Sequence, residues 1–200
     1  MIVYLADLAH DYLPARQFVP LGIGYLASYS NSIFGEKVEF HLFKSVDRLL
    51  DKCEACEPDL VGFANYTWNE RLNAFAGGRL RKRFPELPII MGGPNIDTDE
   101  KGIGEFLGIY PFVDVYCMYN GEISFSNIIQ HCLKNPTKKK TRKLRRDLSF
   151  DRISQCIPIS FHCGYLICLN GVFYVINIIE LQISTYLLQY TLKIMLQFYC

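Results

Sequence analysis

The chain has 200 residues, of which 50% are hydrophobic and 20% charged, a composition typical of a globular protein and not of a disordered one. Its formal net charge of +1 excludes the strong attraction to nucleic acids or membranes that a very basic chain has, so no nucleic-acid partner is expected. Eight cysteines are too few for a disulfide scaffold and no signal peptide opens the chain, so we expect a reducing, cytoplasmic location.

Two regimes of composition divide the chain. Up to about residue 152, charged residues are spread evenly and apolar residues recur in periodic groups. After Arg152, the only Asp, Glu, Lys or Arg residues are Glu180 and Lys193. This change predicts three parts. They are an α/β domain over 1–135, a basic linker over 136–152 and an apolar tail over 153–200.

Apolar runs of strand length recur five times in the first part. They are residues 2–7, 38–43, 59–66, 87–93 and 113–120. Several are apolar at successive positions, which is typical of strands covered on both faces. Helix-length segments lie between them, and the segment 20–35 begins at Pro20 and stops at Gly35, residues favoured at helix ends. Five strand-then-helix units predict a doubly wound, five-stranded parallel sheet, flavodoxin-like or Rossmann-like, with strand order 2-1-3-4-5.

Ligands of such sheets bind outside the carboxyl ends of the strands. These ends read "ADLAH" (6–10), "NYTWN" (65–69), "GGPN" (92–95) and "YNGE" (119–122). They are rich in Gly, Asn, Tyr and Trp and poor in charged catalytic residue types. We therefore expect a neutral, extended ligand held by backbone and side-chain amides, and not acid–base or nucleophilic chemistry.

Two interpretations of each loop stay open. Either Thr67 or Asn69 caps a helix while Trp68, the only tryptophan, is anchored over the core, or this loop forms a polar rim and an aromatic wall for a ligand. The two glycines of 92–95 form either a tight turn or a backbone surface on which a ligand rests. Glu122, in the loop 119–122, either interacts favourably with the dipole of the last helix or belongs to the site.

Other motifs point away from several common sites. A lone histidine such as His10, just past a strand, is more often a loop residue than a metal ligand. Cys53-x-x-Cys56 lies in a helical stretch with no second ligand pair nearby, so half-buried helical cysteines are favoured over zinc or redox use. No Walker loop is present, and no G-x-G-x-x-G follows the first strand, which disfavours a dinucleotide site. The first strand ends on the single acid Asp7, unlike the acidic cluster of a receiver domain.

Four motifs resemble the amino-terminal cobalamin-binding domain of cobalamin-dependent radical S-adenosylmethionine enzymes. They are "VPLGIGYLASY" (19–29), "DLVGFANYTWN" (59–69), "PELPIIMGGPN" (85–95) and "FVDVYCMYNGEISFSNIIQ" (112–130). The resemblance covers roughly residues 1 to 135 and implies that the corrin ring lies across the strand ends. It implies that three loops line the ring and the nucleotide tail. These cofactor-binding candidates are Asn65, Tyr66, Thr67, Trp68, Asn69, Gly92, Gly93, Pro94, Asn95, Asn120, Gly121 and Glu122.

The chain departs from the family pattern in two places. Domains that bind cobalt through histidine carry D-x-H-x-x-G, whereas residues 7–12 read "DLAHDY", so no cobalt ligand is assigned. The family's second domain carries C-x-x-x-C-x-x-C for a 4Fe-4S cluster, and Cys156, Cys163 and Cys168 have other spacings. We expect the cluster and S-adenosylmethionine only in a full-length relative, and no radical activity from this chain alone. The alternative function is a non-enzymatic interaction or sensing module.

The linker and tail carry weaker signals. The basic run 138–146 lacks interleaved aromatic residues and follows a helix end, which favours a solvated linker over a nucleic-acid or lipid patch. Residues 165–179 approach the length of a membrane span but contain asparagine and glycine. Three origins stay open for the tail: translation in a shifted or truncated frame, a membrane anchor within 165–200, or a small subdomain. A membrane-associated location is therefore the alternative to the cytoplasm.

Overall fold

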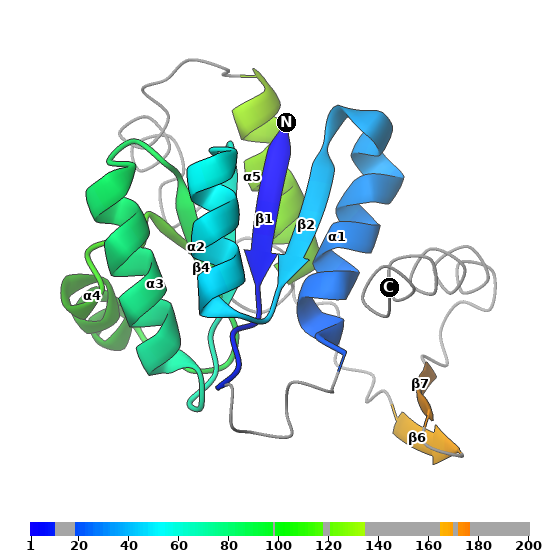
Figure 1. The fold of residues 1–200 in the computed structure, drawn as a ribbon. Helices are drawn as coiled ribbons and strands as arrows, with labels where there is room; N and C mark the ends of the chain where they lie inside the picture. The colour runs from blue at the N-terminus through cyan, green and yellow to red at the C-terminus, as the bar shows by residue number, and fades with distance from the viewer. Residues whose placement is uncertain (11–18, 98, 118–120, 135–164, 170–171, 177–200) are drawn as a thin grey trace. The chain divides into compact units, whose positions relative to one another are not determined.

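The structure is a computed structural model that describes residues 1–10, 19–97, 99–117, 121–134, 165–169 and 172–176. The chain divides into two compact units, Met1–Cys156 and Ile157–Cys200, which are described separately. In the first unit, strands and helices alternate (Figure 1). The strands are β1 (Ile2–Ala6), β2 (Glu39–Phe43), β3 (Leu60–Ala64), β4 (Ile89–Gly92) and β5 (Val115–Cys117). The helices are α1 (Leu21–Phe34), the short 3-10 helix η2 (Gly35–Lys37), α2 (Val46–Ala55), α3 (Glu70–Arg83), α4 (Glu100–Ile109) and α5 (Gly121–Lys134).

All five strands are parallel and lie in the order β2-β1-β3-β4-β5. The predicted doubly wound sheet and its strand order are therefore confirmed. The described ends of the strands differ from the predicted ones by at most two residues, and the helical segment predicted at 20–35 is α1 (Leu21–Phe34). The fifth strand begins at Val115, two residues later than predicted, and its predicted end at residue 120 lies outside the described part of the chain.

Side chains of the strands alternate between two apolar cores. Leu5 and Ile90 belong to the core that α1 and α5 cover. Tyr4 and Met91 belong to the opposite core, which α2 and α3 cover and against which α4 packs. Because both faces of the sheet are buried, neighbouring residues of one strand are both apolar, which is the pattern seen in the sequence.

Strand register brings four carboxyl ends to one edge of the sheet. Ala6 at the end of β1 pairs with Phe63, one residue before the end of β3. Ala64 pairs with Gly92 of β4, and Gly92 pairs with Cys117 of β5. The loops predicted to form a site therefore leave the sheet side by side, although their residues are far apart in the sequence.

In the second unit, the structure describes only two strands, β6 (Tyr165–Leu169) and β7 (Val172–Ile176), which pair antiparallel. They fall within residues 165–179, the stretch that approaches the length of a membrane span, and the described parts of this stretch are strands. Among the residues that the structure describes, no helix is long and apolar enough to cross a membrane. The basic run 138–146 and most of the tail lie outside the described residues.

Candidate functional site

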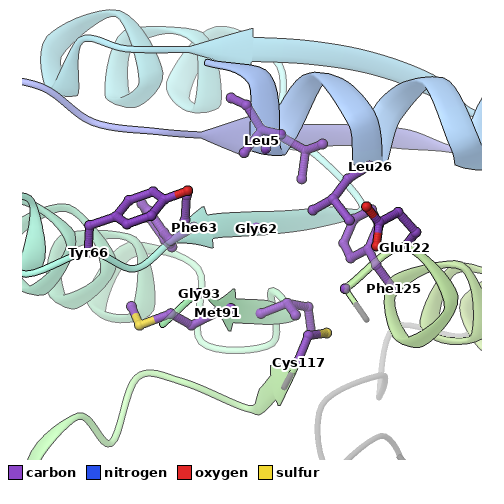
Figure 2. A pocket seen from close by; sticks show the side chains of 16 residues that line it. Leu5, Leu26, Gly62, Phe63, Tyr66, Met91, Gly93, Cys117, Glu122 and Phe125 are labelled. Atoms are coloured by element: carbon purple, nitrogen blue, oxygen red, sulfur yellow. The ribbon is translucent and has the colours of Figure 1, made fainter. Parts of the chain in front are cut away.

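A cavity of about 190 Å³ lies near the carboxyl edge of the sheet, on the face that α1 and α5 cover (Figure 2). Residues of four strands form its floor, and residues of the two helices form its walls. The cavity is partly open to solvent. Its lining consists of Leu5, Gly22, Ile23, Leu26, Gly62, Phe63, Ala64, Tyr66, Ile90, Met91, Gly92, Gly93, Cys117, Gly121, Glu122 and Phe125.

Glycines of the sheet and of both helices shape this cavity. A Cβ at Gly62, in the middle of β3, would lie 2.7 Å from Leu5 Cδ2. On the walls, a Cβ at Gly22 would meet only Tyr66 Oη, at 3.4 Å, and one at Gly121 only Leu26 Cδ2, at 3.4 Å. The sheet and both helices thus present glycine to the same cavity, which larger residues would fill.

The Gly92–Gly93 turn is required by the packing of the backbone. Gly93 has φ of +134°, a region that residues with a Cβ rarely adopt. A Cβ on Gly93 would lie 2.4 Å from the carbonyl oxygen of Asn65. Asn65 N also donates to Gly92 O at 2.6 Å, so the ends of β3 and β4 touch through their backbones. Both glycines line the cavity, so the tight turn and the exposed backbone surface coexist.

Asn65 is fully buried and holds this turn from behind. Its Nδ2 donates to Asn95 O at 2.9 Å and to Tyr116 Oη at 3.2 Å. Tyr116 Oη in turn donates to Gly93 O at 2.9 Å, and burial raises the pKa of Tyr116 to about 12, which keeps the hydroxyl protonated. Asn65 does not lie on a polar rim, because its amide is used to fix the Gly93–Asn95 backbone.

Asn69 is fully buried as well and connects the end of β1 to the loop that follows β3. Its Nδ2 donates to Asp7 Oδ1 at 3.2 Å, and its Oδ1 accepts from Tyr66 N at 2.8 Å. Asn69 occupies the N-cap position of α3, as one interpretation predicted, but its side chain makes no capping bond to the helix. Burial raises the pKa of Asp7, while Lys44 and the Asn69 hydrogen bond oppose that shift.

Trp68 stacks on Tyr66, with ring centroids 4.4 Å apart and an interplanar angle of 7°. Trp68 is 60% exposed, so the interpretation that it is anchored over the core is wrong. Tyr66 lines the cavity, and the pair therefore forms an aromatic surface beside it. Thr67 Oγ1 donates to Asn95 Oδ1 at 3.2 Å, which joins this loop to the Gly92–Asn95 turn.

Asn95 is held on its other side by a polar pair. Asn95 Nδ2 donates to Glu70 Oε2 at 3.2 Å, and Tyr110 Oη donates to Glu70 Oε1. The hydrogen bond to Glu70 raises the pKa of Tyr110 to about 12. The first turn of α3 and the end of α4 thus orient the amide at the end of the glycine turn.

The predicted candidates separate into three groups. Those that line the cavity are Tyr66, Gly92, Gly93, Gly121 and Glu122. Those that surround it without lining it are Asn65, Thr67, Trp68, Asn69, Pro94 and Asn95. Asn120 lies outside the described residues. His10 is not among the lining residues, and no three His, Cys, Asp or Glu side chains in the described part of the chain are grouped to hold a metal ion.

Sequence reasoning missed the helix side of the cavity. Gly22, Ile23 and Leu26 of α1 line it, as does Phe125 of α5. The apolar residues look like ordinary core residues at helical spacing. Gly22 offered a signal, because glycine inside a helix is unfavourable and therefore indicates a packing or binding reason. In the Cys53–Cys56 motif, Cys53 is buried, and burial raises the pKa of its thiol to about 12. A reactive thiolate at Cys53 is therefore disfavoured.

The comparisons with known proteins agree with the motifs. No family model matches the chain. It is 25% identical over 118 residues to the cobalamin-dependent radical SAM methyltransferase TokK of Streptomyces tokunonensis, across 56% of this chain and 17% of TokK. The resemblance to cobalamin-dependent radical S-adenosylmethionine enzymes is confirmed. A second relative is 2-(S-pantetheinyl)-carbapenam-3-carboxylate methyltransferase of Streptantibioticus cattleyicolor. It is 26% identical over 122 residues, across 58% of this chain and 17% of its own length.

A solved structure supports the fold. The cobalamin-dependent S-adenosylmethionine radical enzyme OxsB, solved with aqua-cobalamin and S-adenosylmethionine bound, superposes with a TM-score of 0.50. The match covers 66% of this chain and 19% of OxsB, at 19% sequence identity. The match to each of these proteins thus covers less than a fifth of its length. The superposition with OxsB covers a similar fold over 66% of this chain.

Proposed function

We propose that residues 1–135 bind cobalamin and act as the cofactor domain of a radical S-adenosylmethionine-type enzyme. The observation that carries the proposal is the glycine-lined cavity at the carboxyl edge of a doubly wound sheet, the edge where such sheets bind ligands. The similarity to TokK, whose name states its dependence on cobalamin, supports the choice of ligand. In a full-length enzyme of this type, the reaction and the substrate would depend on the separate domain that carries the iron–sulfur cluster.

The cavity fits one end of cobalamin. An engineered cavity of ~150 Å³ holds benzene, so about 190 Å³ has room for a fused two-ring base but not for a corrin macrocycle. We therefore assign the cavity to the nucleotide tail, and the corrin ring to the strand ends outside it. There the Tyr66–Trp68 pair offers a flat aromatic surface, and the Gly92–Gly93 turn presents backbone without side chains to the corrin.

The residues of this chain bind and orient the cofactor. Gly22 and Gly121 leave space for the tail on the two helix walls, and Gly62 lets Leu5 pack closely on the floor. Asn65 keeps the neighbouring turn in place through its hydrogen bond to Asn95 O. Bound cobalamin supplies a redox-active cobalt atom.

A matched pair of glycine variants tests the assignment. Gly22→Leu places a side chain in the cavity where only Tyr66 Oη lies within 4 Å of the new Cβ. Gly24→Leu makes the same change two residues along α1, where the new Cβ meets nothing within 4 Å and does not line the cavity. Both variants should fold, because leucine favours a helix more than glycine does.

Titration with hydroxocobalamin, followed by the visible spectrum, measures binding. We expect Gly22→Leu to weaken binding roughly tenfold to a hundredfold, as the loss of ~1–3 kcal/mol of contact implies, and Gly24→Leu to leave it unchanged. If the unmodified chain gives no spectral change at all, the proposal fails and the non-enzymatic interaction or sensing module is favoured. Equal affinities of the two folded variants would remove the cavity from the site.

A further inference from the structure

The interior of the cavity is apolar. Leu5, Ile23, Ile90 and Phe125 line it and are each at most 2% exposed. Figure 2 shows Leu5, Leu26 and Phe125 coming together from β1, α1 and α5. A ligand group that enters this space exchanges water for hydrocarbon on most of its surface.

Few polar side chains line the cavity. β1, β3 and β4 each pair with a strand on both sides, so the backbone amides of the floor are used within the sheet. The lining residues with polar side chains are Tyr66, Cys117 and Glu122. Tyr66 and Glu122 lie past the strand ends and are only partly buried, so they belong to the rim. A thiol such as that of Cys117 is a weak hydrogen-bond donor.

Cobamides differ in the base at the end of the nucleotide tail. Cobalamin carries dimethylbenzimidazole, whose outer edge is hydrocarbon with two methyl groups. Pseudocobalamin carries adenine, whose outer edge has an exocyclic amine and ring nitrogens. Burying such polar atoms without partners is costly, whereas burying methyl groups is favourable.

We infer, on the basis of the proposed cobalamin binding, that this cavity selects cobamides with a benzimidazole base over those with a purine base. The corrin and the phosphate are the same in both classes, so the selection arises in the interior formed by Leu5, Ile23, Ile90 and Phe125. One unpaired polar group corresponds to roughly a tenfold to hundredfold loss of affinity.

Three ligands separate this inference from the function on which it rests. The whole chain is titrated with hydroxocobalamin, with pseudocobalamin and with cobinamide, which lacks the nucleotide tail. We expect hydroxocobalamin to bind at least about tenfold more tightly than either of the others. If pseudocobalamin or cobinamide binds as tightly as hydroxocobalamin, the selection is wrong while cobalamin binding stands. If none of the three binds, both proposals are overturned.

A pair of variants at one position tests the physical cause. Leu26 lines the cavity from α1 and is only partly buried, so a polar replacement there is tolerated. Leu26→Gln adds an amide that donates to and accepts from an adenine edge, and should reduce the preference for benzimidazole about tenfold. Leu26→Met keeps the wall apolar and should preserve the preference. An unchanged preference in folded Leu26→Gln, checked by circular dichroism, would contradict the inference.

Discussion

Replacing Arg81 should destabilise the protein far more than replacing Arg83, two residues away on α3. Arg81 Nη2 lies 2.5 Å from Asp114 Oδ2, and the Asp114 side chain is only 1% exposed. Asp114 Oδ2 also accepts from Ile89 N at 2.8 Å, so this carboxylate sits where β4 and β5 begin. The Arg81 guanidinium donates further to three backbone carbonyls, those of Pro85, Leu87 and Phe112.

The size of the effect follows from the buried charge. Arg81→Met leaves the Asp114 carboxylate in the interior without its cation, a change that costs about 3–5 kcal/mol. At 2–4 °C per kcal/mol for a chain of this size, the melting temperature should fall by roughly 6–20 °C. Arg83 pairs with Glu54 at 3.0 Å, but their side chains are 63% and 54% exposed, so Arg83→Met should cost only about 0–1 kcal/mol.

Urea unfolding followed by circular dichroism gives the free energy of unfolding of both variants. Adding Asp114→Asn to Arg81→Met removes the buried charge and retains an acceptor for Ile89 N, so the double variant should regain part of the lost stability. Equal losses in Arg81→Met and Arg83→Met would refute the reasoning, because they would mean that burial of the Asp114 carboxylate does not determine the cost.

Three further outcomes are expected. Gly93→Ala should lower the free energy of unfolding by at least ~1–3 kcal/mol through its positive φ and its contact with Asn65 O, while Gly24→Ala in α1 should raise it by ~0.5–1 kcal/mol in the same urea assay. Because burial raises the pKa of Asp7 in the fold, the unmodified chain should lose stability as the pH rises from the ordinary Asp range through that raised pKa. The free energy of unfolding of Asp7→Asn minus that of the unmodified chain should therefore increase across this pH window and then stay constant. A difference that does not depend on pH would contradict the raised pKa. Alkylation at neutral pH with peptide mass spectrometry should find Cys53 protected until the chain unfolds, and rapid native labelling would contradict its burial.

The fold was predictable because its signals are local. The segment 60–64, for example, has no polar side chain, a pattern typical of strands covered on both faces. Five such runs separated by helical segments leave few topologies, and the handedness of parallel connections narrows them further. The edge that carries the Gly92–Gly93 turn follows from the same topology, so the place of the site was evident before its details.

The details of the site depended on contacts between distant segments. Asn65 and Trp68 stand three residues apart in one polar loop, yet the amide is fully buried and the indole is 60% exposed. Burial of Asn65 is set by Tyr116 and the Gly93 backbone, which approach only when β3, β4 and β5 pair. Local composition cannot distinguish the two side chains.

The sequence by itself determined the parallel sheet, its order and the edge at which the loops gather, because hydrophobic periodicity and glycine turns act over a few residues. Only the tertiary structure decided which residues face the cavity. Gly22 of α1 and Gly62 of β3 are far apart in the sequence and line one cavity only in the folded chain. A missing side chain has no effect until another element lies opposite, so a cavity is a property of packing and not of the local sequence.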